Sequence, residues 1–346
     1  AVSFTTGDVN ADGKLDIVVV SGSTVSSYLG DGTGAFTFGK SSIESRFASI
    51  PNLPSIVTLA DVTDDGKVDL CFGANQVVIG TGTGTLACAA GKGDGSFSAS
   101  TTIKTNLDPV LQVRADDVTG DGKADLLVAT GGEVPIIGGK TGALTVIPMP
   151  AAMPTASYSW TSADKVTAIT SGDYNRDGKN DVAVVSADAR LNIFYGTGDG
   201  KFPSSRSMAA STPGSQLFST DWNKDGKLDL AVASLTDSTI TLYTGNGLGV
   251  LTKQATLVKT GTGPREITTA DINCDGNLDL ISANSKMDNV SVLVGDGKLG
   301  FVEKQFATGA APGVIAAADL NNDGRIDIAV ANDTPKTATV LLNDGQ

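Results

Sequence analysis

The stretch DINCDGNLDL runs from Asp271 to Leu280 and places three Asp and two Asn within nine residues around Gly276. Carboxylates that lie this close repel one another unless a cation or hydrogen-bond donors compensate them. The apolar residues Leu280 and Ile281 follow the last Asp, and this change is typical of a loop that enters a buried strand. The question is whether the stretch is an isolated surface loop or one copy of a repeated unit.

The same nine-residue pattern occurs seven times, starting at Asp8, Asp61, Asp117, Asp173, Asp221, Asp271 and Asp319. In each unit an apolar run precedes the acidic loop, two β-rich runs follow it, and a Gly-rich turn such as GDGTGAF comes next. Short Val- and Ile-rich runs bounded by Gly, Asp and Asn indicate strands. Units of about 50 residues with four strands are typical of propeller blades. The sequence therefore predicts an all-β fold, a single domain over residues 1–346: a seven-bladed β-propeller of four-stranded antiparallel blades, with one calcium loop per blade.

The acidic loops have the donor pattern of a calcium site. Numbered 1 to 9, they carry Asp at positions 1, 5 and 9, Asn or Thr at position 3, and Gly at position 6. Oxygen atoms from side chains 1, 3, 5 and 9 and from the carbonyl of residue 7 suit Ca²⁺, while the glycine permits a sharp turn. The Lys at position 7 of five loops should point outward, because only its carbonyl is needed. Thr63 and Thr119 replace Asn at position 3, so their loops are expected to be the weaker sites. The predicted metal-ligating residues are Asp8, Asn10, Asp12, Lys14, Asp16, Asp61, Thr63, Asp65, Lys67, Asp69, Asp117, Thr119, Asp121, Lys123, Asp125, Asp173, Asn175, Asp177, Lys179, Asp181, Asp221, Asn223, Asp225, Lys227, Asp229, Asp271, Asn273, Asp275, Asn277, Asp279, Asp319, Asn321, Asp323, Arg325 and Asp327.

The charge balance agrees with metal binding. The net charge is −13, and 21 of the 38 acidic residues occupy these loop positions. Seven Ca²⁺ would bring the net charge to about +1. An acidic chain is not expected to bind nucleic acid. The sequence contains no run of 18 apolar residues, so insertion into a membrane is not expected either. The chain contains no histidine, which excludes a Ser-His-Asp triad and a His-ligated zinc.

The three cysteines form no zinc-binding spacing. Cys71 and Cys88 fall in the same repeat, where they are either a disulfide or two buried thiols. Cys274 lies inside an acidic loop and is expected to face solvent.

The acidic loop, the following strand DLAVAS and the turn GDGTGAF resemble FG-GAP/VCBS repeats. Such repeats build the integrin-α-like seven-bladed propeller and a fungal lectin family typified by the Psathyrella velutina lectin. The resemblance covers essentially the whole chain and implies an extracellular (secreted or cell-surface) protein. The family that this chain resembles also includes propellers attached to polysaccharide lyases.

Two classes of function compete. One is a non-catalytic binding module for a glycan or an extracellular protein, and the other is a carbohydrate-active enzyme such as a polysaccharide lyase. An enzyme needs a singular constellation of residues, whereas the polar residues here are repeated. The sequence therefore favours a monomeric binding module with no catalytic residue, and the lectin resemblance favours carbohydrate over integrin-like adhesion. Trp222, at position 2 of the fifth loop, either packs beside the loop or forms a sugar platform; packing is the simpler interpretation.

Strands alternate in direction within a blade, so the acidic loops (between the first and second strands) and the Gly-rich turns (between the third and fourth) should share one face. The binding face is expected on the opposite side, where the connections between blades are long, at residues 41–55 and 147–165. In the second of these, Tyr158 and Trp160 are the candidate ligand-binding residues; the alternative is that Trp160 anchors the loop by packing. The seventh repeat stops at LLNDGQ, so either the last blade is expected to have three strands or the sequence is part of a longer chain.

Overall fold

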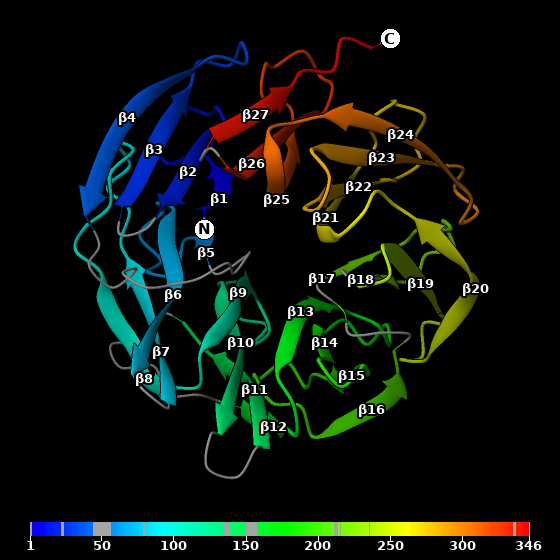
Figure 1. The fold of residues 1–346 in the computed structure, drawn as a ribbon. Helices are drawn as coiled ribbons and strands as arrows, with labels where there is room; N and C mark the ends of the chain where they lie inside the picture. Colours follow the sequence, from blue (N-terminus) through cyan, green and yellow to red (C-terminus); the bar gives the residue numbers. More distant parts are fainter. Residues whose placement is uncertain are drawn as a thin grey trace.

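The protein forms a ring of antiparallel sheets around a central axis (Figure 1). This computed structural model describes residues 2–21, 24–43, 57–78, 81–134, 139–149, 158–210, 214, 216–234, 236–334 and 337–345. Six sheets have four strands and the seventh has three described strands, in chain order from the axis outward. The predicted all-β seven-bladed propeller is therefore confirmed. In the described residues no helix is long and apolar enough to cross a membrane.

Each repeat of the sequence supplies one blade. The strands are β1 (Val2–Gly7), β2 (Asp16–Ser21), β3 (Thr24–Gly30) and β4 (Phe36–Ile43) in blade 1; β5 (Val57–Ala60), β6 (Asp69–Val78), β7 (Thr81–Ala89) and β8 (Thr101–Leu107) in blade 2; β9 (Val110–Asp116), β10 (Asp125–Val134), β11 (Gly139–Ile147) and β12 (Tyr158–Ser162) in blade 3; β13 (Val166–Gly172), β14 (Asp181–Ser186), β15 (Arg190–Tyr195) and β16 (Ser204–Ala209) in blade 4; β17 (Gln216–Thr220), β18 (Asp229–Ser234), β19 (Thr239–Gly245) and β20 (Leu251–Lys259) in blade 5; β21 (Pro264–Ala270), β22 (Asp279–Asn284), β23 (Asn289–Gly295) and β24 (Phe301–Ala307) in blade 6; and β25 (Ala310–Ala318), β26 (Asp327–Thr334) and β27 (Thr337–Leu341) in blade 7.

The hydrophobic core is divided among the blade interfaces. Each of seven apolar clusters joins two successive blades, and one of them joins blade 7 to blade 1 through Phe4, Ile17 and Val314. The second strand of a blade contacts both neighbours, so β14 and β18 are buried at every position. This explains why these strands read as continuous apolar runs rather than alternating ones. The outermost strand β24 is exposed at six of its seven positions.

Side chains do not completely fill the seam between blades 7 and 1. A cavity of about 470 Å³ lies there, lined by Tyr28 and Phe36 of blade 1 and by Ala331, Ala338 and Val340 of blade 7. The lining side chains of blade 7 are small, so they do not fill the space in front of the rings of Tyr28 and Phe36. The inner strands β1 and β25 are nevertheless neighbours, so the ring is closed at the axis.

One long connection does not lie where the sequence predicts. Residues 148–157 join β11 to β12, the third and fourth strands of blade 3, and only residues 163–165 lead on to blade 4. The prediction that residues 147–165 connect two blades is therefore wrong. The reason is that Tyr158–Ser162 pairs with Gly142–Val146 of β11, a contact that the local sequence does not reveal. The other connection expected to be long, residues 41–55, lies mostly outside the described residues.

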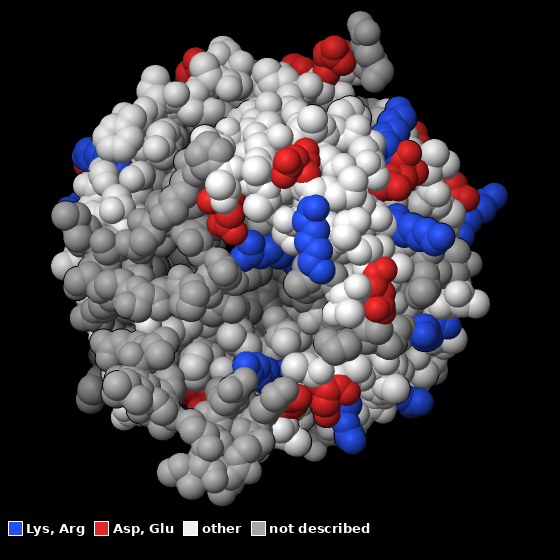
Figure 2. Space-filling view, in the orientation of Figure 1, with Lys and Arg blue, Asp and Glu red and all other residues white. Residues whose placement is uncertain are grey.

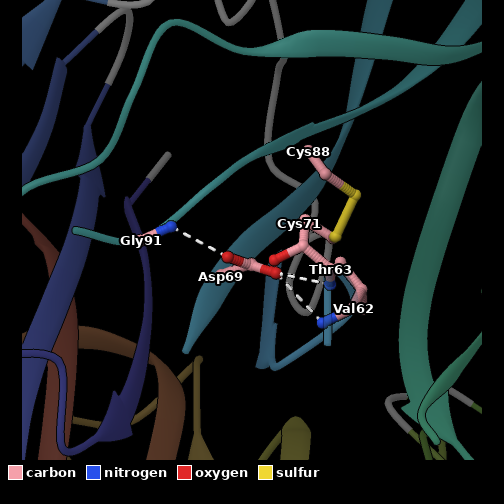
Figure 3. Close-up of a disulfide and its surroundings, with 6 residues drawn as sticks. All are labelled: Val62, Thr63, Asp69, Cys71, Cys88 and Gly91. Carbon is pink, nitrogen blue, oxygen red and sulfur yellow. Dashed lines mark hydrogen bonds between the residues drawn. A yellow bond between two sulfur atoms is a disulfide. The ribbon is translucent and has the colours of Figure 1, made fainter. Parts of the chain in front are cut away.

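Cys71 and Cys88 form a disulfide (Figure 3). They are directly opposite one another on β6 and β7, and both are buried. This resolves the two alternatives for the pair in favour of the bridge. Cys274 is free and exposed, as predicted.

Replacing both bridged cysteines, as Cys71→Ala with Cys88→Ala, is expected to lower the free energy of unfolding by about 3 kcal/mol. The bridge spans 17 residues, and releasing a loop of this size increases the entropy of the unfolded chain by about that much. Urea denaturation measures the change. Cys274→Ala is the matched control and should leave the midpoint unchanged; an equal loss in this control would show that the effect does not come from the bridge.

Candidate functional site

All seven acidic loops adopt one backbone conformation. The residue at position 4 has a positive φ of 57° to 72°, and the glycine at position 6 has a φ of 77° to 83°. The value at position 6 is the reason why only glycine is found there, since other residues are strained in this region. The positive φ at position 4 was not predicted, because a different residue type occupies it in each of the seven loops.

The carboxylate at position 1 organises the loop from inside. In all seven loops its two oxygens accept the backbone N–H groups of residues 5 and 6 at 2.7–3.2 Å. Where position 3 is Asn, its Oδ1 accepts the same N–H of residue 5 at 2.9–3.1 Å. The oxygens of positions 1 and 3 therefore converge on one point. Thr63 and Thr119 make no such bond; their own N–H groups donate to Asp69 and Asp125 instead.

The Asp at position 9 has a structural role that the sequence pattern did not reveal. Its carboxylate is fully buried in every blade. One oxygen accepts the N–H of residue 2 of the loop at 2.9–3.1 Å. The other accepts an N–H at the end of the third strand or just beyond it at 2.8–3.1 Å. Figure 3 shows this arrangement for Asp69, which joins Val62 and Thr63 to Gly91. The residue thus ties the loop to the end of the third strand.

Burial makes these carboxylates costly to ionise. It raises the pKa of Asp181 and of Asp229 to about 6, against the opposing effect of their backbone hydrogen bonds. Burial also raises the pKa of Asp125. A cation close to such a group would favour its ionised form.

The loops carry the kind of oxygen donors that Ca²⁺ prefers, but their carboxylates are not gathered around one point. Among the described residues, no group of three or more acidic, cysteine or histidine side chains lies close enough to hold a metal ion. The position-7 side chains do not all point outward as predicted. Lys227 Nζ lies 3.1 Å from Asp225 Oδ2, and Lys67 and Arg325 also lie against the position-5 carboxylate, because unlike charges two residues apart attract. A bound cation would have to displace these side chains.

Backbone hydrogen bonds between blades show which segments share a face. The N–H groups of Gly34, Gly95 and Gly249, in Gly-rich turns, each donate at 3.0 Å to the carbonyl of loop residue 2 in the preceding blade. At the junction of blades 6 and 7, the side-chain amide of Asn343 donates to Ile272 O at 2.7 Å instead. The prediction that acidic loops and Gly-rich turns share one face is therefore confirmed. Residues 148–157 join a third strand to a fourth, so this segment starts and ends at the same face rather than at the opposite one.

Tyr158 and Trp160, the candidate ligand-binding residues, lie on β12 and pack against blade 4. The Trp160 ring lies 4.9 Å from the ring of Phe194, and the Tyr158 ring lies 5.1 Å from that of Phe202. Both side chains are only partly buried. These ring contacts agree with the interpretation that Trp160 anchors its segment by packing. Contact of Tyr158 or Trp160 with a ligand stays a prediction. Trp222 is buried at 3% exposure and packs against Phe301, as its simpler interpretation predicts.

Trp160→Ala is expected to lower the free energy of unfolding by about 2–4 kcal/mol, because removing the indole uncovers Phe194 at a blade interface. Thermal melting measures the change. Ser159→Ala, at an exposed neighbouring position on the same strand, is the control and should have little effect. A melting temperature of Trp160→Ala equal to that of the control would contradict the packing role.

A polar cleft lies between blades 1 and 2. It has a volume of about 380 Å³ and combines the partly buried ring of Phe97 with Lys40, Lys92, Asp94 and the side chains of four serines, Ser27, Ser41, Ser42 and Ser96. Asp94 pairs with Lys40 of the neighbouring blade. Hydrogen bonds from Lys40 and from Ser96 hold the pKa of Asp94 below its ordinary value. An apolar ring beside fixed donors and acceptors is an arrangement suited to small polar ligands.

The sequence profile of the FG-GAP-like repeat matches residues 8–72, 173–232, 221–282 and 271–330, which together cover more than half of the chain. The chain belongs to the FG-GAP-like repeat family. No curated protein matches this FG-GAP propeller in sequence.

Solved structures with the same fold are distant in sequence. A structure of BBS1N in complex with ARL6DN has a TM-score of 0.66 and 11% identity, over 99% of this chain and 92% of that one. An Agrocybe aegerita lectin that recognises non-reducing terminal N-acetylglucosamine has a TM-score of 0.57 and 17% identity, over 96% and 85%. A putative 6-phosphogluconolactonase from Bacteroides uniformis has a TM-score of 0.60 and 12% identity, over 97% and 94%. At these identities the likeness concerns the fold alone.

Sequence reasoning missed the cleft residues of the FG-GAP propeller. Asp94 occupies the same place in its Gly-rich turn as Asp199 does in blade 4, so the turn alone marks neither as special. The difference lies in their partners. Asp199 pairs with Lys201 two residues away, whereas Asp94 pairs with Lys40 across the blade interface, a contact visible only in the folded chain.

Proposed function

We propose that this FG-GAP propeller is a secreted, calcium-stabilised module that binds carbohydrate without catalysing a reaction. The observation that carries the proposal is the cleft between blades 1 and 2. Its serine hydroxyls and the Asp94 carboxylate can hydrogen-bond sugar hydroxyls, and Phe97 offers an apolar surface to a sugar ring. The lectin of the same fold supports this choice of ligand class, and its stated specificity makes terminal N-acetylglucosamine the first glycan to test.

Calcium is proposed as a structural ion in up to seven acidic loops. The side chains at positions 1, 3, 5 and 9 and the carbonyl of residue 7 would hold it, and its charge would compensate the carboxylates of the loop. The proposed extracellular location is supported by the Cys71–Cys88 bridge, since such bonds persist in oxidising compartments.

A glycan array probed with and without Ca²⁺ tests the function. Binding to glycans that end in N-acetylglucosamine is expected, and Asp94→Asn should weaken it by about tenfold because a charged acceptor is lost. Asp199→Asn is the matched control, since it changes the same turn position in blade 4. No binding to any glycan would contradict the proposal. Release of unsaturated products from acidic polysaccharides would show an enzyme instead of a binding module.

A further inference from the structure

A second cavity lies on the axis of the ring. It has a volume of about 170 Å³ and is lined by the innermost strands of five blades, β1, β5, β9, β21 and β25. Space of this size holds on the order of ten water molecules. Most of the side chains that line it are apolar or are threonines, such as Thr5 and Thr58, whereas Arg114 and Glu266 carry charge.

Arg114 is exceptional because its guanidinium group has no partner among the residues that the structure describes. The Nε atom is fully buried and has no hydrogen bond, and the guanidinium forms no hydrogen bond or ion pair within the described parts of the chain. Burial lowers the pKa of Arg114, which reflects the cost of removing a cation from water. The Arg114 side chain as a whole is partly buried, and an unpaired charge withdrawn from water in this way is unfavourable in a folded protein unless an anion or polar group compensates it.

The nearby carboxylates are engaged by other donors. Asp116 accepts hydrogen bonds from the Ser171 hydroxyl and from Asn180. Glu266 accepts the N–H of Ile315 at 3.3 Å. The negative charges of Glu266 and Asp116 partly offset the cost of burying the Arg114 cation. Neither carboxylate accepts a hydrogen bond from the guanidinium. The terminal N–H groups of the Arg114 guanidinium therefore remain available to a ligand in the cavity.

The charges around Arg114 select the class of anion. A planar guanidinium matches a carboxylate through two parallel hydrogen bonds. A phosphate dianion would place a second negative charge near Glu266 and Asp116, where no further cation compensates it among the residues that line the cavity. The hydroxyls of Thr5 and Thr58 can hydrogen-bond the hydroxyls of a ligand. On the face shown in Figure 2, basic and acidic side chains are interspersed around the axis, so the field there is not of one sign.

We propose that the axial cavity is a binding site for a small hydroxylated monocarboxylate, such as a sugar acid, and that Arg114 holds its carboxylate. This site is separate from the cleft between blades 1 and 2, and it does not depend on the function proposed for that cleft.

Isothermal titration with D-glucuronate at low ionic strength tests the site. Millimolar or tighter binding is expected, and Arg114→Gln should weaken it by about tenfold or more, because a charge-assisted pair is lost. Glu266→Gln should strengthen it by about threefold, since a nearby negative charge is removed. Unchanged affinity in Arg114→Gln would overturn the proposal. Should that variant fail to fold, unchanged or weaker binding by Glu266→Gln would overturn it equally.

Two further ligands and one variant define the specificity. D-glucose has the same ring without the carboxylate and should not bind in this concentration range; binding as tight as that of glucuronate would overturn the role of Arg114. Inorganic phosphate should bind more weakly than glucuronate, and tighter binding would contradict the assignment of a carboxylate. Asp94→Asn should leave glucuronate binding unchanged, and a tenfold loss would place the ligand in the cleft instead.

Discussion

Chelation with excess EDTA is expected to lower the melting temperature of this FG-GAP propeller by at least ~15 °C. A ligand present at about 100 times its Kd, and bound only by the folded state, adds about 2.7 kcal/mol per site. Up to seven sites would together add about 19 kcal/mol. Each kcal/mol corresponds to about 2–4 °C in a domain of roughly 150–250 residues and to somewhat less in this longer chain. Differential scanning calorimetry with and without EDTA measures the shift.

Readdition of metal separates calcium binding from a general effect of the chelator. Ca²⁺ should restore the melting temperature, and Mg²⁺ should restore less of it, because Mg²⁺ demands near-octahedral geometry and retains water. A protein shown to be free of metal whose melting temperature is the same in EDTA and in Ca²⁺ would rule out the structural role of the ion.

Asp181→Ala is expected to cost about 3–5 kcal/mol even in EDTA. Asp181 is fully buried, and its two oxygens accept the N–H groups of Tyr174 at 3.0 Å and Gly196 at 2.9 Å. The substitution leaves both donors buried without acceptors, and each such group costs roughly 1–3 kcal/mol. Urea denaturation in EDTA measures this loss apart from any effect on metal.

Asp177→Ala provides the comparison within the same loop. Asp177 is exposed and lies at position 5, so in EDTA its removal should change stability little. In Ca²⁺ the same variant should lose the site of blade 4. If Asp181→Ala and Asp177→Ala behaved alike in EDTA, the position-9 carboxylate would have no role beyond that of the other loop residues.

The fold follows from the sequence because one loop recurs in register. Glycine at position 6 and Asp at position 1 are determined by the turn itself, because the Asp accepts backbone N–H groups within the loop and the positive φ requires the glycine. Asp at position 9 is only partly determined in this way: one of its oxygens accepts an N–H of the loop, and the other accepts an N–H from the end of the third strand. Local constraints of this kind leave a readable pattern. The same holds for the fully buried second strands, whose apolar runs result from contacts on both faces.

Features that depend on distant pairs left no such pattern. The placement of Tyr158–Ser162 as a fourth strand depends on pairing with β11, and blade 3 lacks the Gly-rich turn that marks this step in other blades. The ion pair of Lys40 with Asp94 joins residues 54 positions apart. Arg114 stands beside Val113 in an ordinary strand sequence, and its isolation is visible only once five blades surround it.

The seam between blades 7 and 1 determines how the ring responds to mechanical tension. Within the described chain no strand is shared between these blades; they are held by packing of side chains such as Phe4 and Val314 and by the bond from Gly34 to Leu320. A force pulling Val2 away from Gly345 therefore loads this junction, together with the β26–β27 ladder through which Gly345 is attached to blade 7. The ladders of blades 2 to 6 are not in its path, so tension on the two ends acts first on blade 7 and its seam with blade 1.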